Sequence, residues 1–132
     1  MKKEVGLWID HRKAVIVTVS GETEEITQIL SNMEKRVRYA GAVDQVKGED
    51  QVDRRYAEHL GKYYDDVISD IRDAASIMIL GPGEAKGEFA KRLQSEGLGA
   101  IIAGVETVDK MTDRQIAAIV RERFAATPAD RS

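Results

Sequence analysis

The sequence predicts an α/β protein in which helices pack on the faces of one mixed β-sheet. The N-terminal part contains short apolar runs of strand character, Val5–Ile9 and Ala14–Val19, separated by a polar turn. From Val52 to Ile71, in contrast, apolar residues return at steps of three and four, as on one face of a long helix. Strand, helix, strand and helix follow in turn. Because parallel neighbours need helical crossovers, this order predicts antiparallel strands first and parallel strands later.

Length and composition are those of one domain. The 132 residues suffice for one shared core, and 42% apolar with 33% charged residues argues against disorder. We assign residues 1–126 to this domain and residues 127–132 to a flexible tail. The absence of cysteine excludes disulfides and thiolate zinc sites. Glu4 and Asp10 interrupt any apolar leader, so we expect no signal peptide, no membrane span and a cytoplasmic protein.

The N-terminal strands are predicted to begin with a hairpin. Val5–Ile9 and Ala14–Val19 have strand character, and the polar DHRK between them is a short turn. A third extended segment follows at Ile26–Leu30. Residues 33–39 are expected to form a further strand, and the turn formers of residues 40–50 indicate an exposed loop.

The later elements have clear boundaries. The long helix contains Gly61, for which a close approach to the sheet is the expected reason. Ser76–Leu80 is a short buried strand, followed by a turn and a helix to about Gln94. Gly99–Val105 is the last predicted strand. The letters TDRQ then form a capping box, with Thr112 as the N-cap of the last helix.

The turn ILGPGEAKGEF, residues 79–89, does not match the known phosphate-binding loops. A Walker loop that begins at Gly81 would need a lysine followed by a hydroxyl residue, but the order here is Lys86, Gly87 and Glu88. The dinucleotide fingerprint fails because its last glycine is replaced by Lys86. We interpret the turn as a corner of the fold and expect no nucleotide or other cofactor.

The densest basic cluster is a candidate nucleic-acid interface. It consists of Lys35, Arg36 and Arg38, and Arg54 and Arg55 begin the helix after the loop. Such a patch beside a loop can contact RNA phosphates. The alternative is that these side chains discourage aggregation at a strand edge. The net charge of −3 gives the whole chain no general attraction to nucleic acid.

Three carboxylates are candidate metal ligands. Asp10 follows the first strand, and Glu106 and Asp109 follow the last. If they converge on magnesium, the site could cleave a phosphodiester by a two-metal route. The alternative is that they are hydrated turn residues. His11 and His59 indicate neither a zinc site nor an acid–base site.

Three segments of the chain together carry a family resemblance. They are the helix RRYAEHLGKYYDDVISDI, the stretch IMILGPGEAKGEFAKRL and the stretch GAIIAGVETVDKMTDRQIAAIV. From Arg54 to Val120 the chain resembles the latter part of the central domain of the archaeal and eukaryotic peptide-chain release factor and of its ribosome-rescue relative Pelota. The N-terminal GLWIDHRKAVIV is similar to the opening hairpin of small bacterial translational-machinery-like proteins. The resemblance implies a ribonuclease-H-like sheet.

The chain departs from the release factors at their catalytic motif. Their loop before the long helix carries Gly-Gly-Gln, which promotes peptidyl-tRNA hydrolysis, whereas the loop here has Gly41 and Gln45 without that motif. The resemblance therefore implies a non-catalytic module that binds ribosomes or structured RNA through the basic cluster. Two alternatives stay open: a nuclease that uses the three carboxylates, and a protein-interaction module that forms a homo-oligomer through an exposed strand edge.

Overall fold

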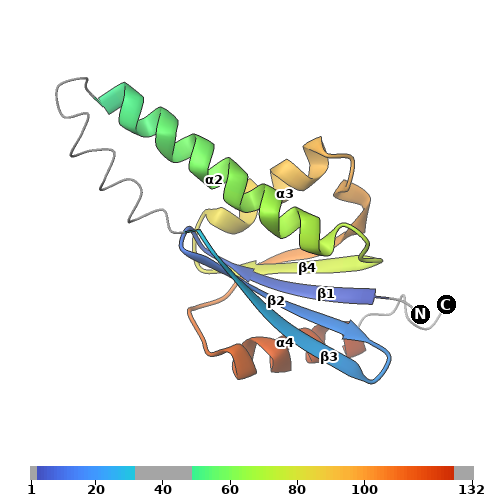
Figure 1. Ribbon diagram of the computed structural model, residues 1–132. Helices are drawn as coiled ribbons and strands as arrows, with labels where there is room; N and C mark the ends of the chain where they lie inside the picture. The colour runs from blue at the N-terminus through green and yellow to red at the C-terminus, as the bar shows by residue number, and fades with distance from the viewer. Residues whose placement is uncertain (1–2, 32–48, 127–132) are drawn as a thin grey trace.

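A five-stranded mixed sheet forms the centre of the structure, a computed structural model that describes residues 3–31 and 49–126 (Figure 1). The predicted strand at residues 33–39, most of the predicted loop and the tail lie outside the described residues. The elements follow in the order β1 (Lys3–Ile9), β2 (Lys13–Ser20), β3 (Thr23–Leu30), α2 (Glu49–Ile71), β4 (Ser76–Gly81), α3 (Ala85–Ser95), the 3-10 turn η2 (Gly99–Ile101), β5 (Ile102–Thr107) and α4 (Asp113–Ala126).

The strand order β3-β2-β1-β4-β5 confirms the predicted mixed sheet. β1, β2 and β3 are antiparallel neighbours joined by tight turns, and β1, β4 and β5 are parallel. A two-residue loop connects β2 to β3, and its Gly21 has a φ of 63°, a conformation that glycine adopts without strain. The parallel pairs are possible because α2 and α3 provide the crossovers.

Helices cover both faces of the sheet. α2 and α3 lie on one face and α4 lies on the other (Figure 1). Successive side chains of β1 point to opposite faces of the sheet: Leu7 packs toward α2, and the neighbouring Trp8 packs toward α4. The predicted capping box is confirmed: Gln115 N–H donates to Thr112 Oγ1 over 3.2 Å, and Thr112 N–H donates to Gln115 Oε1 over 2.9 Å.

The long helix α2 packs on the sheet with its C-terminal half. Its 23 residues make it about 35 Å long. Tyr63, Tyr64, Val67, Ile68 and Ile71 are buried in the core, whereas the N-terminal half extends past the carboxyl ends of β1 and β4 (Figure 1). None of the helices in residues 49–126 is long and apolar enough to span a membrane.

Two local expectations were wrong. Gly61 does not face the sheet: a Cβ there would lie 3.3 Å from the guanidinium of Arg92, so Gly61 makes room for a side chain of α3. The start of the predicted strand at residues 99–105 is the 3-10 turn η2, closed by a bond from Ile101 N–H to Leu98 O of 3.2 Å. Leu98 and Ile101 pack against the core from this turn, so their apolar character reflects burial without a strand.

Candidate functional site

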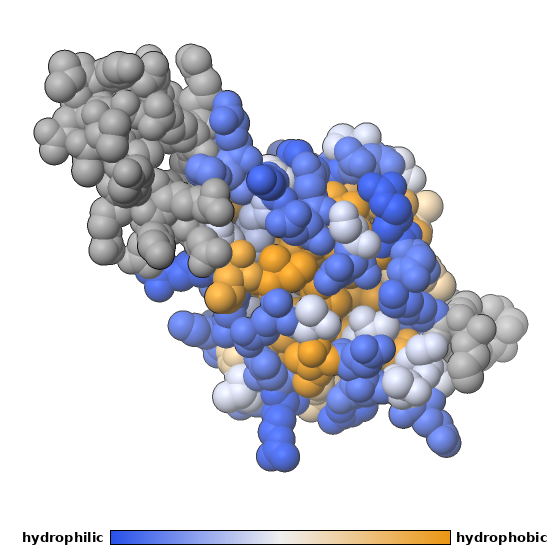
Figure 2. Space-filling model, viewed as in Figure 1, coloured by the Kyte–Doolittle hydropathy of each residue, from blue (hydrophilic) through white to orange (hydrophobic). Residues whose placement is uncertain are grey.

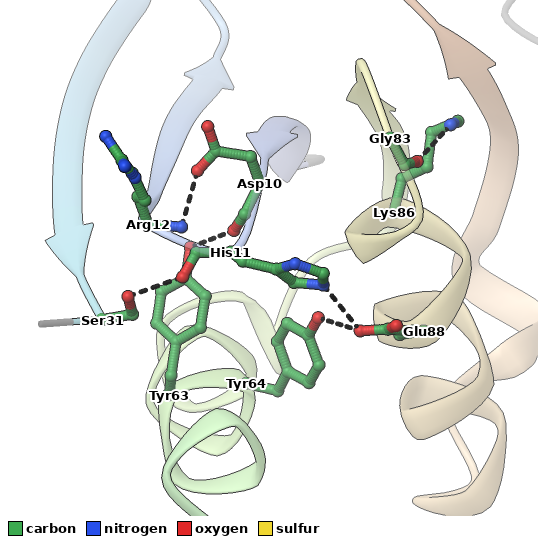
Figure 3. A network of polar contacts seen from close by, with 9 residues as sticks. All are labelled: Asp10, His11, Arg12, Ser31, Tyr63, Tyr64, Gly83, Lys86 and Glu88. Atoms are coloured by element: carbon green, nitrogen blue, oxygen red, sulfur yellow. Dashed lines mark hydrogen bonds and ion pairs between the residues drawn. The ribbon is translucent and has the colours of Figure 1, made fainter. Parts of the chain in front are cut away.

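A network of polar side chains lies at the edge of the sheet where β1 and β4 end. We call it the Glu88 network; its members are Asp10, His11, Ser31, Tyr63, Tyr64 and Glu88 (Figure 3). Three parts of the chain meet here: the β1–β2 turn with the end of β3, the middle of α2, and the first turns of α3. The carboxyl edge of parallel strands is a common position for ligand sites in α/β folds.

Glu88 is the centre of this network. Its Oε1 accepts a hydrogen bond of 2.7 Å from the Tyr64 hydroxyl and lies 3.0 Å from His11 Nε2. Because a carboxylate oxygen only accepts hydrogen bonds, the His11 ring carries its proton on Nε2 in this contact. The Tyr64 ring also packs edge-on against Phe89, with the ring centroids 5.8 Å apart. Glu88 therefore ties α3 both to α2 and to the β1–β2 turn.

The remaining contacts of the network hold the turn itself. The Asp10 carboxylate accepts bonds of 2.8 Å from the amides of Arg12 and Lys13, which is the usual way for Asp to stabilise a turn. The Tyr63 hydroxyl donates to Asp10 O over 3.0 Å. Burial, with a contribution from the Asp10 charge, raises the pKa of Tyr63, so the hydroxyl stays protonated as this contact requires. Ser31 Oγ donates to His11 O over 2.6 Å.

The Glu88 network fixes the positions of the β1–β2 turn, the end of β3 and the middle of α2. The segment that carries the predicted basic cluster starts immediately after Ser31 and ends where α2 begins. The network therefore anchors the sheet end of that segment. It also anchors the middle of α2, the helix into which the segment leads.

The predicted RNA-binding residues are only partly visible. Lys35, Arg36 and Arg38, and the loop residues Gly41 and Gln45, lie outside the described residues. Arg54 and Arg55 belong to the N-terminal third of α2, which extends past the sheet. They stay predicted contact residues.

The structure does not gather the three candidate metal ligands. Asp10 is occupied by the turn amides described above. Both carboxylate oxygens of Glu106 bind Arg123, at 2.9 Å and 2.5 Å, and this hydrogen bonding holds the pKa of Glu106 below its usual value. Asp109 contributes its backbone oxygen, which accepts a bond of 3.2 Å from Trp8 Nε1. Within residues 3–31 and 49–126 there is no group of three or more His, Cys, Asp or Glu side chains that could hold a metal ion.

The Gly-Pro-Gly turn has a packing reason for its first glycine. A Cβ on Gly81 would collide with the backbone oxygen of Ile9, so only glycine permits β4 to end beside β1. Gly81 O also accepts a bond of 3.0 Å from Val108 N–H, which fixes the chain after β5. Lys86, the lysine compared with that of a phosphate loop, turns back to Gly83 O at 2.5 Å. These contacts support the interpretation of the turn as a corner of the fold.

Two shallow grooves flank Glu88. One, of about 360 Å³, lies between α2 and α3; the other, of about 490 Å³, lies at the start of α3 beside β5. Glu88 and Lys91 line both. Sequence reasoning missed the central role of Glu88, because its partner His11 is 77 residues away and no spacing rule connects them.

No protein-family model matches this chain, and no curated protein matches it. Among solved structures, the Pelota protein of Thermoplasma acidophilum aligns with 96% of this chain at 15% identity and a TM-score of 0.60. Pelota of Archaeoglobus fulgidus aligns with 92% of it at 16% identity and a TM-score of 0.58.

The archaeal translation termination factor aRF1 aligns with 97% of this chain and 41% of its own at 16% identity, with a TM-score of 0.48. The chain spans about a third of the two Pelota proteins, 33% and 31% of their lengths. The two Pelota structures show the fold: this chain has the architecture of a Pelota-like α/β domain.

Proposed function

We propose that this chain is a non-catalytic binding module that contacts ribosomes through their structured RNA. The Pelota-like fold supports it, as does the resemblance of the sequence to a family of release and ribosome-rescue factors. The missing Gly-Gly-Gln motif removes the reason to expect peptidyl-tRNA hydrolysis. The contact residues are Lys35, Arg36, Arg38, Arg54 and Arg55.

The observation that carries the proposal is the projection of α2 beyond the sheet (Figure 1). All five basic residues lie between the end of β3 and the first third of this helix. The Glu88 network fixes the base from which α2 extends. Arg54 and Arg55, on the part of α2 that projects past the sheet, can reach phosphates that lie away from the sheet, and phosphate contacts supply most of sequence-independent affinity.

The test is co-sedimentation of the purified protein with intact and stalled ribosomes across a salt series. We expect binding that weakens as salt rises but persists near physiological strength. In an Arg36→Gln, Arg38→Gln variant the slope of log affinity against log salt should fall by about two, because each phosphate contact contributes about one unit.

The matched control changes two arginines elsewhere. Arg72 and Arg114 are exposed and lie in the described part of the chain, after α2 and at the start of α4. An Arg72→Gln, Arg114→Gln variant has the same net charge as the test variant and should bind as the parent does. An equal loss of ribosome affinity in the two double variants would mean that net charge alone drives binding. Unchanged binding by the Arg36→Gln, Arg38→Gln variant would contradict the proposed surface.

A further inference from the structure

The sheet has two edges, and they differ in how well they are protected. β5 is short, and a register shift between Ile77 and Met78 of β4 inserts Ala103 into it, which is a bulge. Bulges interrupt strand pairing at edges. β3 has eight residues, pairs with β2 in unbroken register, and contains neither proline nor lysine. Its Glu24 and Glu25 lie near the N-terminal end, so the stretch from Ile26 to Leu30 contains no charged side chain, proline or bulge.

Exposed apolar side chains lie along the same strand. In the described part of the chain three large hydrophobic residues are exposed, and two are on β3: Ile26 at 42% and Leu30 at 59%. They are four residues apart, so they point to the same face of the sheet, the face covered by α4. Figure 2 shows hydrophobic surface over the region where β3 faces the viewer in Figure 1.

The hairpin determines which backbone groups of β3 face outward. The loop between Ser20 and Thr23 has two residues, so this flanking pair is hydrogen-bonded, and hydrogen-bonded pairs alternate along the ladder. Thr23, Glu25, Thr27 and Ile29 thus direct their N–H and C=O groups to β2. Ile26, Gln28 and Leu30 direct theirs away from the sheet. An approaching strand would bond to these three residues.

We propose that β3 pairs with β3 of a second copy of this chain, antiparallel and centred on Gln28. In this register Ile26 lies opposite Leu30 of the second copy, and Leu30 lies opposite its Ile26. Each exposed apolar residue is then covered by one from the second copy, and the three residues that bond across the interface, Ile26, Gln28 and Leu30, all have outward backbone groups. On the other face Thr27 meets Ile29 of the second copy, a pair of β-branched residues that suits adjacent strands.

Charge supports this register. The glutamates of β3, Glu24 and Glu25, lie outside the paired segment from Ile26 to Leu30, so the core of the interface holds no facing like charges. Glu24 is neutralised within its own copy, because Arg121 Nη1 lies 2.6 Å from its Oε1. Gln28 sits on the two-fold axis; its Nε2 donates to Asp113 Oδ2 of its own copy over 3.2 Å, and its carbonyl oxygen can accept a bond from the second copy.

The expected dimer is modest in strength. The five-residue paired segment is about 17 Å long, and an interface built mainly on such a short edge belongs to the small class, below about 1,200 Å². We therefore expect a reversible dimer with a dissociation constant of about micromolar order. The inference concerns the protein alone and does not depend on ribosome binding.

Sedimentation velocity over a concentration series of the purified chain tests the dimer. We expect a shift from monomer to twice that mass, and an Ile26→Lys variant should weaken association by about tenfold or more. The matched control is Val105→Lys, the same change at the exposed apolar residue of β5, which is 46% exposed. A monomer at every concentration, or equal weakening by both variants, would overturn the proposal.

A cysteine experiment tests the register without relying on altered stability. The chain has no cysteine, so one introduced residue gives a clean readout. In the proposed register the two copies of Gln28 have Cα atoms about 5.5 Å apart, within disulfide range, whereas the two copies of Ile26 are about 14 Å apart. Mild oxidation should cross-link Gln28→Cys efficiently and Ile26→Cys poorly. The reverse, or equal cross-linking, would rule out this pairing.

Discussion

Gly6 shows how closely two elements of this fold approach each other. It lies in β1 opposite Val120 of α4, and a Cβ at this position would overlap the Val120 side chain. Val120 is fully buried between the sheet and α4, so it has little room to move. The glycine is therefore required by packing, although its own φ is not positive.

We expect Gly6→Ala to lower the free energy of unfolding by about 1–3 kcal/mol, the usual cost of overpacking a filled core. Urea denaturation measures it. The control is Gly87→Ala in α3, where an added Cβ meets nothing within 4 Å and alanine favours the helix, so this change should stabilise by up to about 1 kcal/mol. Equal stability of Gly6→Ala and the parent would contradict the close contact of β1 with α4.

Glycines also show where sequence reasoning reached its limit. The long helix was predicted correctly from its period, but the reason for Gly61 was not, because the sequence gives no information on which neighbour meets a given helix position. The same holds for Glu88, whose partners come from the β1–β2 turn and α2. Local patterns predicted the capping box because Thr112 and Gln115 are three residues apart.

At the scale of elements, an ion pair joins the two helices on one face. Arg92 of α3 crosses over Gly61 and binds Asp65 of α2 through two bonds, of 2.7 Å and 3.0 Å. The hydrogen bond from Arg92 lowers the pKa of Asp65 from its ordinary value of 3.8. Gly61 and Asp65 lie one helical turn apart. Gly61 therefore provides the space for the Arg92 side chain, and Asp65 binds its guanidinium.

We expect Asp65→Asn to destabilise the protein by up to about 1 kcal/mol at neutral pH, as for a partly exposed ion pair. A carboxylate with a lowered folded-state pKa stabilises the protein at pH values above its unfolded pKa, near 3.8. This contribution is lost as pH falls from there through the lower folded-state pKa. The difference between variant and parent should therefore vanish in acid. Urea denaturation at several pH values measures the difference in unfolding free energy. The control is Asp66→Asn, the same change at the next residue, which is also exposed.

Most elements were predictable because their signals are local. Period, turn formers and caps specified the β1–β2 hairpin, β3, α2, β4, α3 and α4. η2 was predicted as part of a strand because a short apolar run has no period that distinguishes a strand from a helical turn. The basic cluster stays a prediction from composition, since Lys35, Arg36 and Arg38 lie outside the described residues.

At the scale of the whole molecule, two apolar layers share one sheet. The layer toward α2 and α3 contains Leu7, Ile16 and Ile79, and the layer toward α4 contains Trp8, Val15 and Leu80. These residues alternate on β1, β2 and β4, so each of the three strands contributes to both layers. Loss of either layer would expose the apolar back of the same strands, which should make unfolding of the two layers cooperative.

The single tryptophan makes this cooperativity measurable. Trp8 lies in the layer toward α4, whereas Ile68 of α2 lies on the opposite face. Ile68→Ala should cost about 2–5 kcal/mol by creating a cavity in the α2 layer. If the domain unfolds as one unit, the Trp8 fluorescence midpoint in urea should shift as far as the midpoint from circular dichroism, although Trp8 does not contact the cavity. A Trp8 transition that stays at the parent midpoint would mean that α4 and its strands hold together after α2 is released.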